Sequence, residues 1–130
     1  MEALPTEKEV KSAVFGINKD NAAGRDGFSS LFYQAWWEII KGDLTEAVMD
    51  FFHGFSQPKG FSSSMIVLIP KRLGAVHWKD LRPISLCNVC SKLLSKILST
   101  RLNKVLPEIV SPFQAGFVPG RHIEDNILVA

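Results

Sequence analysis

The sequence predicts an α/β (α+β) fold that is mainly helical and contains a small sheet. Apolar residues recur at helical spacing in several separate segments, whereas Ser64–Pro70 is a β-branched, apolar run of strand length. The chain has 130 residues, of which 46% are hydrophobic, and this is enough for a folded core. We therefore expect residues 1–130 to form one unit, with no second domain.

The first predicted helix begins near Thr6, because Thr6 and Glu9 have the spacing of a capping box. Apolar residues at helical spacing continue the helix to about Asn18, where a polar turn follows. The next segment, Ala22–Phe28, contains two glycines three residues apart and is expected to be a loop. No GxxxxGK pattern follows these glycines, so they are interpreted as turn residues.

Two further helices are expected in the N-terminal half. The first begins near Ser30 and has an apolar face that includes Trp36. Gly42 is expected to break this helix, because glycine has a low helix propensity. Asp43 and Glu46 then repeat the capping pattern and predict the start of the next helix.

The strands of the small sheet are expected in the C-terminal half. Ser64–Pro70 is the clearest strand, and its final proline cannot donate to a ladder of hydrogen bonds. The following segment, up to Asp80, is expected to be a loop. Pro83 biases Arg82 away from helical geometry, so Leu81–Ile84 is expected to be extended.

A long helix is expected to follow, from about Ser85 to Leu106, with Pro107 closing it. Beyond it, Phe113–Val118 is a candidate short strand and Asp125–Ala130 a candidate helix start, with a turn at Gly120 between them.

The charge distribution suggests a polyanionic partner. Residues 66–130 carry nine of the 15 Lys and Arg residues but only four of the 13 acidic residues. The start of the chain is acidic and is not a signal peptide, and no apolar run approaches the roughly 20 residues of a membrane span. Cys87 and Cys90 form an isolated CxxC, which favours reduced thiols on a helix over a metal site. An intracellular location, cytoplasmic or nuclear, is therefore expected.

Several side chains are candidates for contacts with phosphates. Lys71 and Arg82 each adjoin a proline at an apolar segment, where they are suited to a triphosphate; the alternative is a pair of exposed surface charges. Lys92, Lys96 and Arg101 lie along the long predicted helix. Such a row can follow a nucleic-acid backbone, although a solvated helix face is equally consistent. Trp78, in a polar loop, is a candidate platform for base stacking.

Four segments occur in an order that resembles a known family. They are AAGRDGFSSLFYQ, VLIPKR, DLRPISLCNVCSKLLSKILSTRLN and SPFQAGFVPGRHIEDNILVA. Together they resemble the N-terminal portion of the reverse transcriptase domain of plant LINE-type (non-LTR) retrotransposons, over roughly Val10 to Ala130. That family has a right-hand polymerase fold, and the resemblance implies the fingers and the start of the palm, incomplete and truncated before the catalytic aspartates.

The resemblance also implies roles for individual residues. Lys71 and Arg82 would lie near the triphosphate of the incoming deoxynucleotide. Arg121 and the helix that carries Lys92, Lys96 and Arg101 would lie along the path of the RNA template and DNA primer. The family's loop usually reads APGPDG, whereas Ala23 and Arg25 replace both prolines here, which is expected to loosen the loop.

The family's chemistry requires Mg²⁺ ions held by carboxylates, including those of a Y/F-x-D-D turn. The sequence contains no Asp-Asp pair, so no catalytic or metal-binding residue is expected and the chain alone should be inactive. It is interpreted as a fragment of an RNA-directed DNA polymerase that lacks the remaining palm and thumb. The alternatives are a non-catalytic nucleic-acid-binding module and an inert relic.

Overall fold

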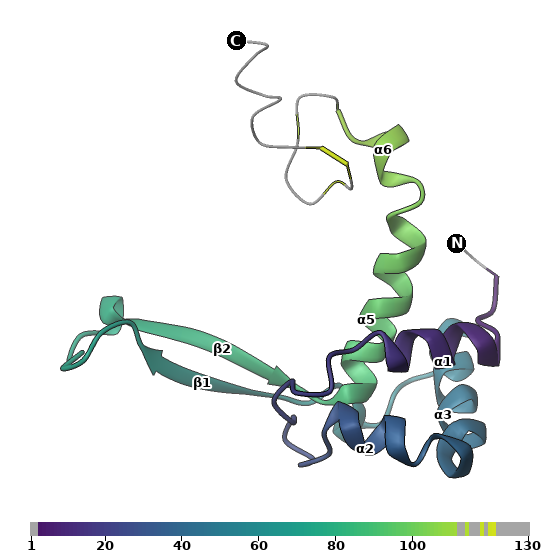
Figure 1. The fold of residues 1–130 in the computed structure, drawn as a ribbon, viewed down its shortest axis with the longest axis horizontal. Helices are drawn as coiled ribbons and strands as arrows, with labels where there is room; N and C mark the ends of the chain where they lie inside the picture. The colour runs from purple at the N-terminus through teal and green to yellow at the C-terminus, as the bar shows by residue number, and fades with distance from the viewer. Residues whose placement is uncertain (1–2, 112–113, 115–117, 119, 122–130) are drawn as a thin grey trace.

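The computed structural model describes residues 3–111, 114, 118, 120 and 121. Helices gather into a body, from which a two-stranded hairpin projects (Figure 1). This mixture of helices with a small antiparallel sheet confirms the predicted α+β class. In chain order the elements are α1 (Glu7–Phe15), α2 (Ser30–Ala35), α3 (Trp37–Phe52), α4 (Lys59–Ser62), β1 (Ser64–Pro70), the 3₁₀ turn η1 (Trp78–Asp80), β2 (Leu81–Cys87), α5 (Val89–Leu102) and α6 (Leu106–Ile109).

The core lies where α1, α3 and α5 meet (Figure 1). Each helix contributes apolar side chains at the three- and four-residue spacing that places them on one face. Because the three helices bury these faces against one another, the core positions the end of α1 beside the first turns of α5. The buried members are Val10, Ala13, Val14 and Ile17, then Trp37, Leu44 and Val48, and finally Val89, Leu93, Leu94 and Ile97.

The start of α1 confirms the predicted helix cap. The hydroxyl oxygen of Thr6 accepts a hydrogen bond from the backbone N–H of Glu9 at 3.3 Å. The helix ends at Phe15, three residues before the predicted end. The side-chain amide of Gln34 donates to the carbonyls of Val14 and Ile17 at 3.0 and 2.9 Å, so α2 is fixed to the end of α1.

The predicted break at Gly42 is wrong, because α3 runs without interruption through this glycine. The chain bends instead at Trp36, between α2 and α3, and Asp43 lies in a helix interior rather than in a cap. This bend changes which tryptophan faces the core, since Trp37 is 3% exposed and Trp36 is 52% exposed. An interior glycine costs only about 1 kcal/mol, which the packing of α3 offsets.

The hairpin confirms the predicted strand Ser64–Pro70 and the extended segment that begins at Leu81. The strands pair antiparallel, from Ser64 opposite Cys87 to Pro70 opposite Leu81. The second strand therefore continues to Cys87, and the predicted helix start at Ser85 is wrong. Backbone pairing with β1 holds these extra residues extended, although their apolar spacing also fits a helix.

Helix α5 begins after Asn88 and ends at Leu102, four residues before the predicted end. Pro107 does not close it but lies in the first turn of α6, where a missing N–H is tolerated. Gly120 adopts φ +79°, in agreement with the predicted turn. The predicted elements at 113–118 and 125–130 fall mainly outside the described residues. No helix in the described part of the chain is long and apolar enough to cross a membrane.

Candidate nucleic-acid interface

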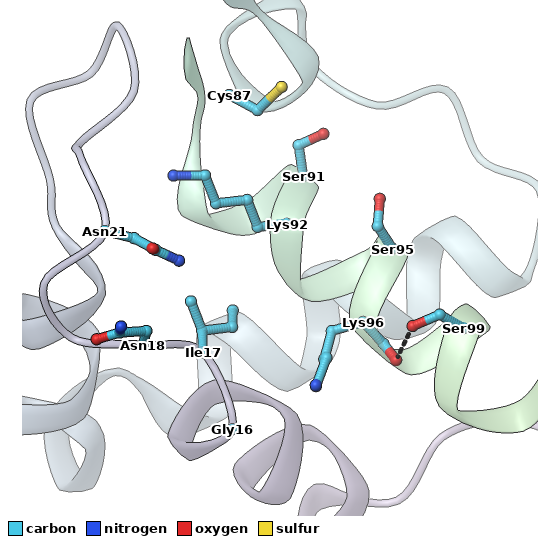
Figure 2. A pocket seen from close by; sticks show the side chains of 10 residues that line it. All are labelled: Gly16, Ile17, Asn18, Asn21, Cys87, Ser91, Lys92, Ser95, Lys96 and Ser99. Carbon is cyan, nitrogen blue, oxygen red and sulfur yellow. Dashed lines mark hydrogen bonds between the residues drawn. The ribbon is translucent and has the colours of Figure 1, made fainter. Parts of the chain in front are cut away.

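An open groove of about 460 Å³ lies between the end of α1 and one face of α5 (Figure 2). The serines of α5 recur every four residues and form one wall, beside two lysines with the same spacing. None of the ten lining residues is acidic. The groove is lined by Gly16, Ile17, Asn18, Asn21, Cys87, Ser91, Lys92, Ser95, Lys96 and Ser99.

The two lysines of the groove, Lys92 and Lys96, differ in what they contact. The ammonium group of Lys92 donates to the carbonyl of Ala22 at 2.8 Å and so fixes the loop before α2 to α5. The ammonium group of Lys96 has no hydrogen bond or ion pair with another described residue. Both lysines line one groove, and the charge of Lys96 is available to a ligand.

The guanidinium of Arg101 forms hydrogen bonds with other residues of the protein. Its Nε and Nη2 atoms each donate to the Glu9 carboxylate at 2.7 Å, and Nη1 donates to the carbonyl of Ala3 at 2.6 Å. The guanidinium carbon also lies 4.9 Å from the centre of the Phe52 ring. Hydrogen bonds from Arg101 lower the pKa of Glu9 below its ordinary value. Arg101 therefore joins α5 to α1 and α3, and its predicted contact with nucleic acid stays a prediction.

Arg121 likewise has intramolecular partners. Its Nη1 atom donates to the carbonyls of Ser111 and Gln114 at 2.6 and 3.0 Å. Its Nη2 atom donates to the carbonyls of Pro107 and Val110 at 3.0 and 3.1 Å. These bonds satisfy carbonyl groups at and after α6, which gives Arg121 a structural role. Its predicted place along a template path also stays a prediction.

Lys71 and Arg82, the predicted nucleotide-binding pair, lie together near the distal end of the hairpin. Arg82 lies in β2 opposite Ile69, and Lys71 directly follows the last residue of β1. The ammonium group of Lys71 donates to the carbonyl of Lys79 at 2.6 Å. Arg82 is exposed, and its guanidinium has no hydrogen bond or ion pair with any described residue. The hairpin therefore carries both residues at its distal end, with Lys71 directly after β1 and Arg82 within β2.

The loop at the hairpin tip carries further basic and aromatic side chains. Arg72 forms an ion pair with Asp80 at 3.1 Å, which neutralises one charge. Trp78 is 79% exposed, in agreement with the prediction of an exposed ring in this loop. Its proposed stacking on bases is a separate matter and stays a prediction.

The two cysteines occupy different elements, which corrects the prediction that both lie on a helix. Cys87 ends β2, whereas Cys90 lies in the first turn of α5, and both thiols are half-buried. The hydroxyl of Tyr33 lies 3.3 Å from the Cys90 sulfur. Burial raises the pKa of the Tyr33 hydroxyl and the pKa of the Cys90 thiol above their ordinary values. The thiol of Cys90 is therefore protonated near neutral pH.

Sequence reasoning missed Asn88, which links three segments. Its side-chain oxygen accepts from the Asp26 N–H at 3.3 Å, and its amide donates to the Gly60 carbonyl at 2.5 Å. An asparagine directly after a strand and before a helix is an available signal, because asparagine is favoured at helix starts. The serine spacing of α5 was also a readable signal for a polar helix face.

Comparison with known proteins finds relatives among the proteins of transposable elements. The chain is 30% identical over 129 residues to the Transposon TX1 uncharacterized 149 kDa protein of Xenopus laevis, covering 99% of this chain and 10% of that protein. It is 27% identical over 124 residues to the Retrovirus-related Pol polyprotein from type-2 retrotransposable element R2DM of Drosophila melanogaster, covering 95% of this chain and 11% of that protein. No protein-family model matches. The chain thus spans about a tenth of the length of these relatives, and it is similar to retrotransposon proteins.

Proposed function

We propose that this chain is the nucleic-acid-binding fingers portion, with the start of the palm, of a retrotransposon reverse transcriptase. The observation that carries the proposal is the groove along α5, which combines cations, hydroxyls and amides with no acidic side chain. Similarity to transposable-element proteins and the order of the four resembling segments support the same assignment.

The groove is suited to a sugar-phosphate backbone. Lys92 and Lys96 are four residues apart, or about 6 Å along the helix axis, so both can face one strand. The hydroxyls of Ser91 and Ser95 and the asparagine amides can donate to phosphate oxygens and can also pair with ribose hydroxyls. None of the ten described lining residues is aromatic, so these residues give bases no stacking platform. The expected binding is therefore weak and independent of base sequence.

The hairpin would serve the incoming deoxynucleoside triphosphate. The guanidinium fork of Arg82 matches phosphate oxygens, and Lys71 adds a positive charge at the same end of the hairpin. The described residues contain no cluster of three or more His, Cys, Asp or Glu side chains that could hold a metal. In a whole enzyme of the polymerase family, the carboxylates that hold Mg²⁺ would come from other segments.

Salt dependence of oligonucleotide binding tests the groove. A fluorescent 12-nucleotide RNA is titrated with the protein between 50 and 200 mM salt. Each phosphate neutralised on a single strand contributes a slope of about −0.7 in log affinity against log salt. Lys96→Ala should therefore make the slope shallower by about 0.7. Lys41→Ala, which removes a lysine paired with Glu38 on α3, is the control and should leave the slope unchanged.

Binding that does not respond to salt would contradict the proposal, as would an equal change of slope in both variants. The nucleotide contact is tested separately with Arg82→Ala in a complete reverse transcriptase that carries this segment. Loss of a charged hydrogen-bonding contact should raise the nucleotide concentration needed for incorporation by about tenfold or more. Unchanged nucleotide dependence would assign Arg82 a structural role in the hairpin.

A further inference from the structure

A second, smaller cavity of about 300 Å³ lies between the loop before α2 and the short helix α4. It is distinct from the groove along α5, because the two share no lining residue. Two of its lining side chains are cationic and one is acidic. The cavity is lined by Arg25, Asp26, Lys59, Gly60, Ser63 and Asn88.

The walls of this cavity are held together by one buried polar side chain. Asn88 is 2% exposed, and its amide group bonds the backbone of Asp26 on one wall and of Gly60 on the other. The loop approaches so closely that a Cβ atom at Gly24 would lie 2.2 Å from the Asn88 side-chain oxygen. Only glycine fits there, so two segments far apart in sequence have a fixed relative position.

The loop before α2 forms a turn that carries Arg25. The N–H of Gly27 donates to the carbonyl of Gly24 at 3.1 Å, which closes a four-residue turn with Arg25 and Asp26 at its corners. One carboxylate oxygen of Asp26 accepts from the N–H of Phe28 at 3.1 Å and orients that side chain. These contacts hold the loop in place although the prolines of the resembling family are absent.

The two cations of the cavity have no partner in the part of the chain that the structure describes. Neither the guanidinium of Arg25 nor the ammonium of Lys59 forms a hydrogen bond or ion pair with another described residue. Arg72, Arg101 and Arg121, by contrast, bond carboxylates or carbonyls of the protein. An unpaired arginine and an unpaired lysine on opposite walls of one cavity form a suitable arrangement for a phosphate.

We propose that Arg25 and Lys59 form a second phosphate-binding site, with Asp26 accepting a hydrogen bond from a neighbouring hydroxyl of the same ligand. This combination selects a sugar phosphate, either a free nucleotide or a unit of an RNA strand. Arg25 stands where the resembling family usually has proline, so the guanidinium belongs to this chain and not to the common loop. The site goes beyond the proposed α5 groove and does not depend on it.

Binding of two probes tests the site. The 130-residue protein is titrated with uridine 5′-triphosphate and, separately, with a fluorescent 12-nucleotide oligouridylate. The double variant Arg25→Ala/Lys59→Ala should bind at least one probe with about tenfold lower affinity, because it lacks a bidentate donor and a point charge. The matched control is Lys11→Ala/Lys41→Ala, which removes the same charge around Glu38 and should change either affinity less than twofold.

Three results support the proposal and distinguish its sources. If the double variant binds only the triphosphate more weakly, the ligand is a free nucleotide. If it binds only the oligonucleotide more weakly, the ligand is an RNA strand. If it binds both probes more weakly, the two share this phosphate site. Arg25→Gln, which keeps a polar, hydrogen-bonding side chain and removes the charge, should reproduce most of the loss in a natively folded protein. No change with either probe, or equal weakening by the control double variant, would overturn the site.

Discussion

The helical body and the hairpin differ in how much of their apolar surface is covered. In the body, side chains such as Val10, Val48 and Leu93 are fully buried. In the hairpin neither strand contains a buried residue, and Ile66 is 67% exposed. The body is therefore stabilised by packing, whereas the hairpin depends on backbone pairing and on its continuity with α5.

Both regions contain cations that bond within the protein and cations that have no partner among the described residues. Lys92 and Arg101, in the body, form hydrogen bonds that join helices and loops. Arg82, in the hairpin, has no partner among the described residues. The comparison indicates that a cation in the body must be assessed for its structural role before it is assigned to a ligand, and that Lys96 is the body's exception on α5.

The largest expected effect separates the two regions directly. Leu93→Ala removes a fully buried side chain from α5 and should lower the free energy of unfolding by about 2–5 kcal/mol. Ile66→Thr changes an exposed strand position to another β-branched residue and should cost less than about 0.5 kcal/mol. Urea unfolding followed by circular dichroism measures both values. Equal losses would contradict the division into a packed body and an uncovered hairpin.

Two glycines of the body should respond in opposite directions to alanine. Gly24→Ala places a methyl group against the buried Asn88 side chain and should destabilise the protein by about 1–3 kcal/mol. Gly42→Ala adds a methyl group in open space within α3 and should stabilise it by about 0.5–1 kcal/mol. Thermal unfolding of both variants checks the signs. Stabilisation by Gly24→Ala would show that the loop does not approach Asn88 closely.

Removal of the Glu9–Arg101 ion pair should lower the free energy of unfolding by a smaller amount, and this loss should depend on pH. The folded protein lowers the pKa of Glu9, so the ionised carboxylate stabilises the fold at neutral pH and this contribution is lost as pH falls through the lowered pKa. Glu9→Gln should therefore cost about 1 kcal/mol at pH 7. The difference from the original protein should shrink towards zero below about pH 4.

Chemical denaturation at pH 7, 5 and 3 measures this pH dependence. Glu46→Gln is the matched control, because Glu46 is exposed on α3 and has no ion pair with a described residue. A cost of Glu9→Gln that stays constant across this range would show that the carboxylate's charge does not stabilise the fold.

The sequence predicted those features that depend on local patterns. The Thr6 cap, the strand Ser64–Pro70 and the helical core faces were all readable, because spacing and β-branching determine them locally. The element boundaries that the sequence predicted wrongly depend on tertiary contacts. Packing carries α3 through Gly42, and pairing with β1 keeps residues up to Cys87 extended.

The candidate sites divide in the same way. Residue type and spacing indicated the basic face that holds Lys92 and Lys96, and the hairpin carries Lys71 and Arg82 at its distal end. Sequence could not show that Arg101 is bound to Glu9, because the two are 92 positions apart. It also could not show that Asn88 links two segments, since each hydrogen bond forms only after the chain has folded.

A lysine acetylation footprint tests most directly whether the groove on the helical body binds nucleic acid. The protein is briefly acetylated with and without a saturating 12-nucleotide RNA, and the modification of each lysine is read by mass spectrometry. The account predicts that RNA protects Lys96 in the groove, whereas Lys41 on α3 and Lys79 in the hairpin loop keep their reactivity. Protection confined to Lys79, with Lys96 unchanged, would contradict the account and place the nucleic acid on the hairpin.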